Sequence, residues 1–273
     1  MLYLLVLVLF FSGCSANERQ SEGVAEKWLS RTYVEQRVAE AVAGAEGFAA
    51  EDSIAFAACG KALIDTMAAD TTAVSLLAEL MEHYLYNPNS PVRNEEWYGV
   101  FLKQLLSEKK IPVSLRERGG YQLGKILKNR RGVMAADFSF DIPEVSCRNT
   151  LHGIESEWTL LVFYDPECSH CTETLRRIAG SYNLNRMISA GLMTVLAIYA
   201  EGKREVWEKS LSALPSDWIV GFDRSQIVDR ELYTLDAMPT LYLLDCNKNV
   251  VLKDPSTKAL DRWLLANGPS GGS

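Results

Sequence analysis

The sequence predicts a helical N-terminal part followed by an α/β domain, and two observations carry that fold class. Up to about position 131, apolar residues recur at helical spacing and strand-like alternation does not occur. From position 135, short apolar runs of strand length alternate with amphipathic segments and end in a hairpin and a helix. We therefore expect an all-α domain over residues 23–131 and an α/β domain over residues 135–267.

Three groups of apolar residues predict buried helix faces in the N-terminal part, because their members lie three or four positions apart. The groups are Val34, Val38 and Val42; Leu77, Leu80, Met81 and Tyr84; and Trp97, Phe101 and Leu105. Pro88 and Pro91 end one helix, since proline disrupts a helix interior. Asn94, with Glu95 and Glu96 behind it, then has the features of a helix N-cap followed by an acidic first turn.

Six segments of the C-terminal part are predicted strands: residues 137–142, 158–165, 192–200, 218–222, 240–245 and 249–254. The second of these, "WTLLVFYD", is a continuous apolar run, which is typical of a central strand covered on both faces. The last two flank "CNKN" and predict a hairpin. Helices are expected from Cys168 onward, over 203–214 and over 257–267.

The start of the chain has the pattern of an export signal. Its apolar run, "LYLLVLVLFF", is too short to span a bilayer as a mature helix. The following "FSGC" resembles a bacterial lipobox, which implies a signal peptide over residues 1–14, a lipid on Cys14 and a polar tether over residues 15–22. We expect a lipoprotein of the cell envelope, held at the inner or the outer membrane and facing the periplasm. The alternative is a plain signal peptide with an incidental Cys14 and secretion to the periplasm.

Charge and composition exclude some partners. The formal net charge of −7 argues against a nucleic acid held through its phosphates. The basic stretch "KILKNRRG" (125–132) is interpreted as a solvated helix end beside a linker. Residues 268–273, "GPSGGS", are expected to be disordered.

Five cysteines remain after Cys14, an odd and sparse set that excludes a disulfide-stapled scaffold. Cys59 is expected to be a small buried residue in a helix, Cys147 to hold an ordinary strand position and Cys246 to be exposed in the hairpin turn. His83 and His152 are isolated and are assigned no chemistry.

The remaining pair, Cys168 and Cys171, follows a predicted buried strand and begins a helix. The unpaired N–H groups and the dipole of a helix start favour negative charge, so the pKa of Cys168 should fall. Cys171, one helical turn further on, should be more buried. This pattern indicates thiol–disulfide exchange, in which the first sulfur attacks a disulfide and the second resolves the mixed disulfide.

A second element, Met238-Pro239, comes directly before a predicted apolar strand. Proline lacks an N–H and therefore belongs at a strand start. If the peptide bond is cis, Pro239 presents a flat surface and the backbone of Met238 beside the sulfurs. Met238 then lines a substrate groove, and ordinary packing is the alternative role for its side chain.

Residues 135–267 resemble the thioredoxin superfamily in its TlpA/ResA-like envelope branch. The resemblance is carried by "WTLLVFYDPECSHC", "AMPTLYLLD" and the closing hairpin and helix. The helical half, with "YLYNPNSPVRNEEWY" and "NRRGVMAADFSF", resembles an uncharacterised domain joined to such modules in envelope lipoproteins. The resemblance implies a thioredoxin-like fold, with a central mixed sheet flanked by helices. It also implies the site residues: Cys168 attacks, Cys171 resolves, Pro239 is the cis-proline, and Met238, Tyr164 and Thr240 bind substrate.

This chain departs from the thioredoxin pattern around the cysteines. Glu167 stands where thioredoxins carry Trp, and Ser169-His170 stands in place of Gly-Pro. A protonated His170 would stabilise the thiolate and raise the reduction potential, whereas Glu167 would act in the opposite direction. We expect His170 to dominate, giving a potential above that of thioredoxin. Val162 occupies the place of thioredoxin's buried acid, so no residue is assigned to proton handling.

The expected substrates are cysteine-containing envelope proteins, and a membrane or thioredoxin-like electron donor or acceptor would recycle the pair. No metal or organic cofactor is expected, because electrons pass through the sulfurs. Two alternatives stay open. The pair could be a structural disulfide in a non-enzymatic binding lipoprotein that retains the fold. Alternatively, Cys168, His170 and Cys171 could belong to a zinc site whose fourth ligand comes from Cys147 or His152.

Overall fold

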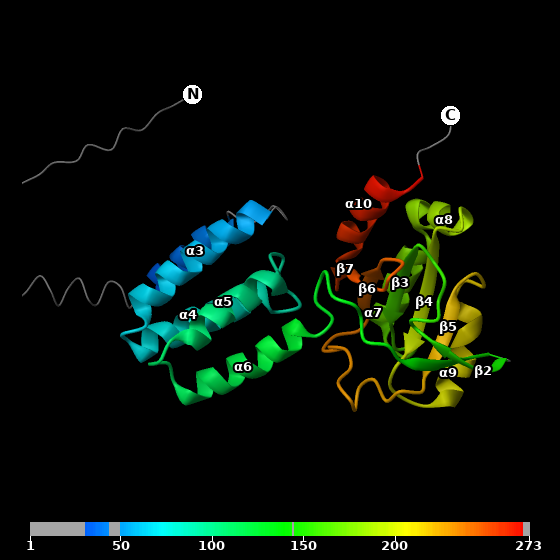
Figure 1. Cartoon of the computed structure of the whole chain (residues 1–273), viewed down its shortest axis with the longest axis horizontal. Coiled ribbons are helices and arrows are strands. Elements are labelled where there is room, and N and C mark those ends of the chain that lie inside the picture. The colour runs from blue at the N-terminus through cyan, green and yellow to red at the C-terminus, as the bar shows by residue number, and fades with distance from the viewer. Residues whose placement is uncertain (1–30, 44–49, 144, 270–273) are drawn as a thin grey trace, which may run out of the picture. The chain divides into compact units, whose positions relative to one another are not determined.

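The structure, a computed structural model, describes residues 31–43, 50–143 and 145–269. The predicted signal peptide, Cys14, the tether and residues 270–273 of the predicted tail lie outside the described residues. The chain divides into two compact units that meet between Gly120 and Tyr121. Figure 1 shows the helices of the first unit and the sheet of the second, and each unit is described by itself.

The first unit is helical, as the sequence predicts. Its elements are α2 (Arg31–Ala43), α3 (Ala50–Met67), α4 (Thr71–Leu85), α5 (Glu95–Ser107) and the first part of α6 (Val113–Leu127). The predicted buried faces are largely confirmed: Val34, Leu77 and Phe101 are completely buried, and Tyr84 is only partly so. Asn94 caps α5 as expected, because its side chain accepts the N–H of Trp97 at 3.2 Å.

The second unit contains a seven-stranded mixed sheet in the described part of the chain. The strands are β1 (Ser139–Ile142), β2 (Val145–Thr150), β3 (Trp158–Phe163), β4 (Met193–Tyr199), β5 (Ile219–Asp223), β6 (Thr240–Leu244) and β7 (Val250–Lys253). Their order is β2-β1-β5-β4-β3-β6-β7. Strand β4 runs parallel to β3 and β5, and the other pairs are antiparallel.

The helices of this unit are α7 (Ser169–Ala179), α8 (Tyr182–Ser189), α9 (Arg204–Ser210), followed by a short 3-10 turn (Leu211–Ala213), and α10 (Thr257–Asn267). The six predicted strands and the three predicted helices are all present. Strand β2 and helix α8 were not predicted as elements. The fold class is therefore confirmed: a mixed sheet flanked by helices follows a helical region.

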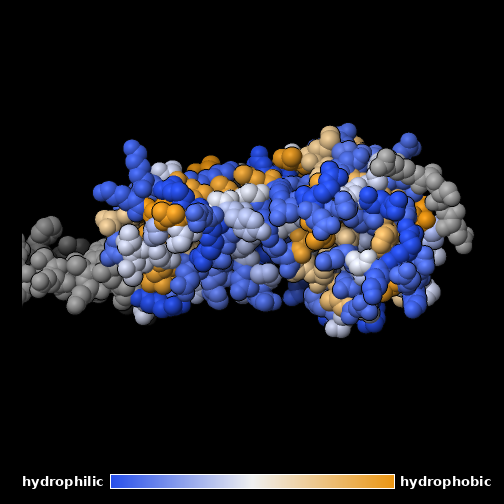
Figure 2. Space-filling view, turned by 90° about the horizontal axis from the view of Figure 1, so that it is seen from below, coloured by the Kyte–Doolittle hydropathy of each residue, from blue (hydrophilic) through white to orange (hydrophobic). Residues whose placement is uncertain are grey.

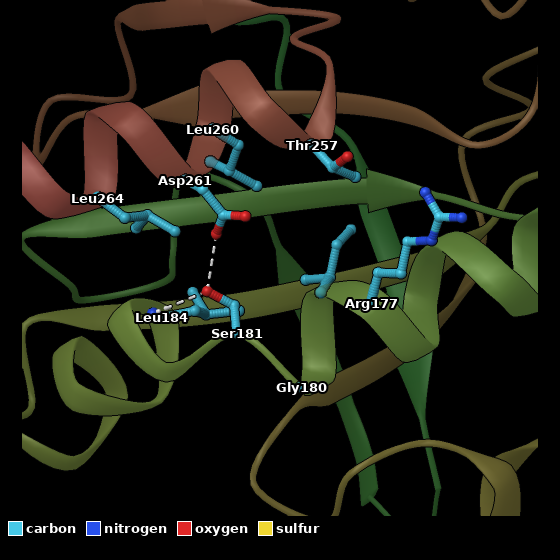
Figure 3. A pocket seen from close by; sticks show the side chains of 9 residues that line it. Arg177, Gly180, Ser181, Leu184, Thr257, Leu260, Asp261 and Leu264 are labelled. Atoms are coloured by element: carbon cyan, nitrogen blue, oxygen red, sulfur yellow. Dashed lines mark hydrogen bonds between the residues drawn. The ribbon is translucent and has the colours of Figure 1, made fainter.

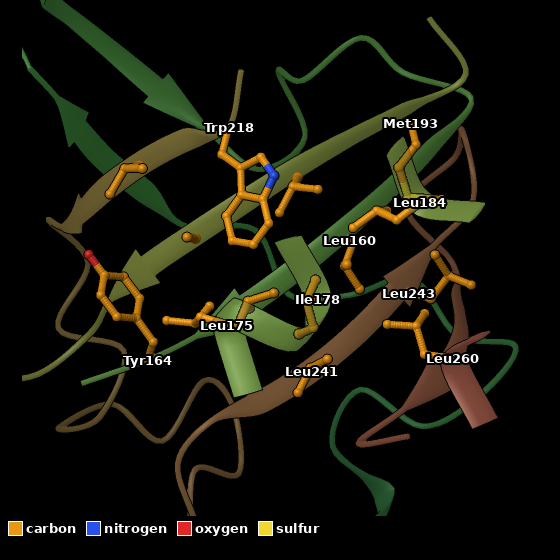
Figure 4. Close-up of a cluster of buried hydrophobic side chains, with 14 of the residues drawn as sticks. Leu160, Tyr164, Leu175, Ile178, Leu184, Met193, Trp218, Leu241, Leu243 and Leu260 are labelled. Carbon is orange, nitrogen blue, oxygen red and sulfur yellow. The ribbon is translucent and has the colours of Figure 1, made fainter. Parts of the chain in front are cut away.

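Two hydrophobic cores lie on opposite faces of the sheet, because successive residues of β3 point to opposite sides. Leu160 and Val162 face helices α7, α8 and α10, and Figure 4 shows Leu175, Leu184 and Leu260 packed on that side. Val162 of β3 and Cys171 of α7 lie on this face, and both are completely buried. The apolar run of β3 is explained, since both of its faces are covered.

The opposite face of the sheet is covered by irregular segments among the described residues. Leu161 and Phe163 of β3 pack there against Phe138, Ile227 and Tyr233. Ile227 and Tyr233 come from the long connection between β5 and β6, and both are buried. That connection is therefore part of the core.

The surface is predominantly hydrophilic on the face shown in Figure 2, with apolar residues interspersed. Exposed large apolar side chains within the described ranges include Ile54, Val113, Tyr182 and Leu265. Of the helices in those ranges, none combines the length with the apolar character that crossing a bilayer requires.

Gly221 gives a test of the packing at β5. A Cβ there would lie 2.6 Å from Phe140 Cδ2 and 2.7 Å from Ile198 Cδ1, and both side chains are buried. Gly221→Ala should therefore lower the free energy of unfolding by about 1–3 kcal/mol, measured by urea unfolding. Gly124→Ala is the matched control, because Gly124 is exposed in α6 with no neighbour within 4 Å. It should stabilise by about 0.5–1 kcal/mol, and an unchanged stability of Gly221→Ala would contradict the packing.

Candidate active site

The cysteine pair lies at one edge of the sheet, where β3 ends. After Phe163 the chain passes through Tyr164 and a short turn, and α7 then begins. Phe163 is paired with Thr240, the first residue of β6. Met238-Pro239 directly precedes Thr240, so it lies at the same edge of the sheet as the turn before the cysteines.

The turn between β3 and α7 is fixed by its own residues. Asp165 Oδ1 accepts the N–H of Glu167 at 2.9 Å, an arrangement that stabilises a turn through the aspartate side chain. Pro166, between them, restricts the backbone further. The N–H of Cys168 donates to the carbonyl of Asp165 at 3.2 Å. The sequence "DPEC" therefore delivers Cys168 to the start of α7.

Cys168 is the N-cap of α7, and its sulfur takes the role that a capping oxygen usually plays. The N–H of Cys171 donates to Cys168 Sγ at 3.4 Å. This backbone N–H is the main cause that lowers the pKa of Cys168. The Cys171 thiol and the backbone N–H of His170 act in the same direction, while burial opposes them. Partly exposed Cys168 is therefore the better thiolate of the two.

Cys171 has the opposite character. Its side chain is completely buried in the helix-side core. Burial raises the pKa of Cys171 to about 12, although the N–H of Asp165 donates to its sulfur at 3.5 Å. At neutral pH Cys171 therefore stays a thiol, one helical turn below a sulfur that ionises more easily. Both cysteines are free in the structure.

The predicted substrate-binding residues differ in exposure. The Met238-Pro239 peptide is cis. Met238 is partly buried, and both Met238 and Cys168 pack against the core that contains Cys171. Tyr164 and Thr240 are buried, and their hydroxyls are engaged inside the protein, with Ser210 Oγ at 3.2 Å and with the carbonyl of Ala237 at 2.6 Å. Direct contact of Tyr164 and Thr240 with a substrate stays a prediction.

Comparisons with known proteins agree with this geometry. A solved thioredoxin-like protein from Bacteroides caccae has 27% sequence identity and a TM-score of 0.76, and the match covers 92% of this chain and 86% of that one. The chain therefore has a thioredoxin-like fold. Residues 46–129 match the model of a domain of unknown function, DUF5106. Both resemblances expected from the sequence are thus confirmed.

Two further solved structures match half of this chain, and both come from Bacteroides fragilis. One is the C-terminal domain of an uncharacterized protein, at 33% identity and TM-score 0.49, with 50% of this chain and 99% of that chain covered. The other is a conserved protein of unknown function, at 36% identity and TM-score 0.47, with 50% of this chain and 98% of that one covered. No curated protein sequence matched the chain.

Sequence reasoning missed Asp165 as a functional residue of the thioredoxin-like domain. Its carboxylate raises the pKa of both Cys168 and Cys171, because a nearby negative charge disfavours a thiolate. The available signal was its position, immediately after a buried strand and three residues before the first cysteine. Glu167, which was expected to act in this way, is exposed.

His170 lowers the pKa of Cys168 through its backbone and not through its imidazole ring. The imidazole is exposed, and the contribution of His170 to the lowered pKa of Cys168 comes from its backbone N–H. An effect of the ring on the reduction potential stays a prediction.

The other cysteines and histidines give little chemistry. Cys246 is exposed, as expected, whereas Cys59 is only partly buried. The side chain of Cys147 lies outside the described residues. His152 Nε2 lies 2.8 Å from the carbonyl of Ala135. Within the described ranges, no three His, Cys, Asp or Glu side chains form a group that could hold a metal ion.

A pocket of about 360 Å³ lies elsewhere in the thioredoxin-like domain, between α7, the start of α8 and α10. Figure 3 shows Ser181 bonded to Asp261 at 2.8 Å in this pocket, with Leu260 and Leu264 beside them. Neither cysteine nor Pro239 lines the pocket. It is therefore separate from the candidate active site.

The two thiols should differ in their response to pH. In the reduced protein, alkylation of Cys168 by iodoacetamide should reach half its maximal rate below about pH 8.5, the ordinary value for a cysteine. The physical reason is the N–H of Cys171, which favours the thiolate. Cys171 should stay unmodified up to about pH 10, because its pKa is about 12. Peptide mass spectrometry separates the sites, with exposed Cys246 as an internal comparison. A Cys168 midpoint at or above pH 8.5 would contradict the assignment.

Asp165→Asn should lower the pKa of both thiols. The asparagine oxygen still accepts the N–H of Glu167, so the turn is kept while the negative charge is removed. The same alkylation titration measures the shift for Cys168. Glu167→Gln is the matched control, since it removes a charge next to Cys168 from an exposed side chain. A larger shift in Glu167→Gln than in Asp165→Asn would reject the role given to Asp165.

Proposed function

We propose that this protein is a thiol–disulfide oxidoreductase of the cell envelope that acts on protein disulfides or thiols through Cys168 and Cys171. The observation that carries the proposal is the contrast between the two sulfurs. Cys168 is partly exposed with a lowered pKa, and Cys171 is buried with a raised one. The similarity to a solved thioredoxin-like protein supports the same reaction class.

The chemistry proceeds in two exchange steps. The Cys168 thiolate attacks one sulfur of a substrate disulfide, forming a mixed disulfide and releasing the other substrate sulfur as a thiolate. Cys171 then passes its proton to the substrate thiolate released in the first step and attacks Cys168 Sγ, which forms the Cys168–Cys171 disulfide and releases the second substrate thiolate. Two electrons thus pass to the substrate, and the same steps in reverse oxidise a dithiol.

The buried position of Cys171 suits the second step. Because Cys171 is a thiol at neutral pH, it does not compete with Cys168 for the incoming disulfide. The two cysteine side chains are already within hydrogen-bond reach of each other before the mixed disulfide forms. The resolving step is then intramolecular, which gives it the advantage of proximity.

Substrates and recycling partners follow from this chemistry. A pair that ends as a disulfide must be reduced by a second dithiol, and we propose a membrane or thioredoxin-like partner for that step. The envelope location rests on the apolar run and "FSGC" at the start of the chain. Lipid attachment at Cys14 belongs to the same proposal.

The competing function is a binding lipoprotein in which the cysteines form a structural disulfide. A structural pair does not need one thiol that ionises easily, whereas an exchange reaction does. The lowered pKa of Cys168 therefore favours the enzyme.

Trapping tests the function. Cys171→Ser should leave Cys168 joined to its substrate, because no second sulfur resolves the mixed disulfide. Non-reducing electrophoresis of envelope extracts should show adducts that dithiothreitol releases, and mass spectrometry names the partners. Cys168→Ser should trap nothing, and Cys246→Ser should behave like the parent, since Cys246 lies outside the pair. Equal adducts from Cys168→Ser and Cys171→Ser would sink the proposed function.

A further inference from the structure

The connection between β5 and β6, residues 224–239, carries Met238-Pro239 to the active-site edge. It contains no regular helix or strand. A segment of this length without its own backbone ladder has many conformations open to it unless other contacts restrict it. The contacts that hold it therefore determine where Met238 and Pro239 lie. We refer to residues 224–239 as the substrate loop.

The first part of the substrate loop is anchored by the last residue of β5 and by the sheet core. The carboxylate of Asp223 accepts the N–H groups of Ser225 and Ile227, each at 2.7 Å. Ile227 and Tyr233 are buried in the sheet core, and the Tyr233 hydroxyl donates to the carbonyl of Ala136 at 2.6 Å. Two buried side chains and these hydrogen bonds therefore fix this part of the loop.

The part nearest Pro239 is held by the end of α6. The Thr234 hydroxyl donates to the carbonyl of Lys125 at 3.2 Å, and Lys125 Nζ donates to Asp236 Oδ1 at 2.5 Å. Lys128 Nζ donates to Glu231 Oε2 at 2.7 Å, and this bond lowers the pKa of Glu231. Residues 125–132 were interpreted as a solvated helix end, and both ion pairs lie at that exposed helix end and were not predicted.

Asn129 contacts the substrate loop from a buried position. Its side chain is buried, and its backbone has φ +46°, which asparagine tolerates better than most residues. Its amide group donates to the carbonyl of Leu232 at 2.8 Å, and its side-chain oxygen accepts the N–H of Ala136 at 2.8 Å. One side chain thus joins the end of α6, the substrate loop and the start of the sheet.

The end of α6 is itself fixed to the sheet. Lys253 Nζ, from β7, donates to the carbonyls of Ile126 and Lys128, each at 3.2 Å. A positive charge at the C-terminus of a helix satisfies carbonyls that lack intrahelical partners and interacts favourably with the helix dipole. The residues that hold the loop are therefore themselves attached to the sheet through Lys253.

We propose that residues 125–129, the last part of the region matched by DUF5106, form a brace that positions the substrate loop for the cysteine pair. The inference rests on the proposed function and gives this part of a domain without known function a role in it. Lys125, Lys128 and Asn129 are positioning residues, because they act through the loop and not on the sulfurs. All three belong to the second compact unit, which begins at Tyr121.

The test separates loop position from thiol chemistry. Lys125→Ala/Lys128→Ala should raise the KM for insulin, a protein disulfide, about 5- to 10-fold, since two partly exposed ion pairs are lost. The value of kcat and the pKa of Cys168 should change little, because neither lysine contacts the pair. Arg130→Ala is the matched control, since it removes a cation from the same stretch at an exposed position. An unchanged KM in the double variant, or an equal rise in Arg130→Ala, would overturn the brace.

Exchanging the charges of Lys128 and Glu231 distinguishes loss of the ion pair from misfolding of the variant. Lys128→Glu alone should raise the KM for insulin, and Lys128→Glu/Glu231→Lys should return it toward the parent value by restoring an ion pair. Equal KM values for the single and the double exchange would count against the proposal.

A second readout keeps the brace distinct from the enzymatic function. If the parent protein neither reduces insulin nor reoxidises its reduced chains, the proposed function fails while the brace is still testable. Hydrogen exchange of peptides covering 234–238 should then become faster in Lys125→Ala/Lys128→Ala and not in Arg130→Ala. Unchanged exchange in the double variant would reject the brace on structural grounds alone.

Discussion

The chemistry of this chain depends on the bond between the N–H of Cys171 and the sulfur of Cys168. Every α-helix begins with N–H groups that have no partner within the helix. Here one of them meets a sulfur in place of an oxygen, 3.4 Å away. The same spacing, with two residues between the cysteines, places both the more easily ionised sulfur and the N–H that stabilises its charge. The formation of helix α7 therefore also lowers the pKa of Cys168.

The sheet provides the second half of that arrangement. Strand β3 is central, and its alternation divides the domain into two cores. Cys171 follows the helix into the core that also holds Val162, and this burial raises its pKa. The difference between the thiols therefore comes from depth: one lies at the helix tip and the other one turn inside. The turn "DPE" adds a negative charge from Asp165 that acts on both sulfurs.

Local pattern was enough to predict most elements and the position of the cysteine pair. The closing helix runs over residues 257–267 as expected, and Asn94 caps α5 as its residue type suggests. Helix α8 was not predicted, because its eight residues are too few for a clear periodicity. The effect of Asp165 on Cys171 depends on how the turn folds back over α7. The contacts of Lys128 with Glu231 join residues 103 positions apart, and no local pattern encodes such a pairing.

One feature of the fold limits how the segment before Pro239 can change. The connection that leads to Pro239 also contributes Ile227 and Tyr233 to the sheet core, so the segment that we propose as the substrate loop is also a structural one. Transplanting it whole from a relative would exchange core side chains as well as surface ones. Between Tyr233 and Met238, Asp236 and Ala237 are the exposed positions among the described residues. Because Asp236 accepts a hydrogen bond from Lys125, Ala237 is the exposed neighbour of Met238 whose side chain can change with that contact left intact.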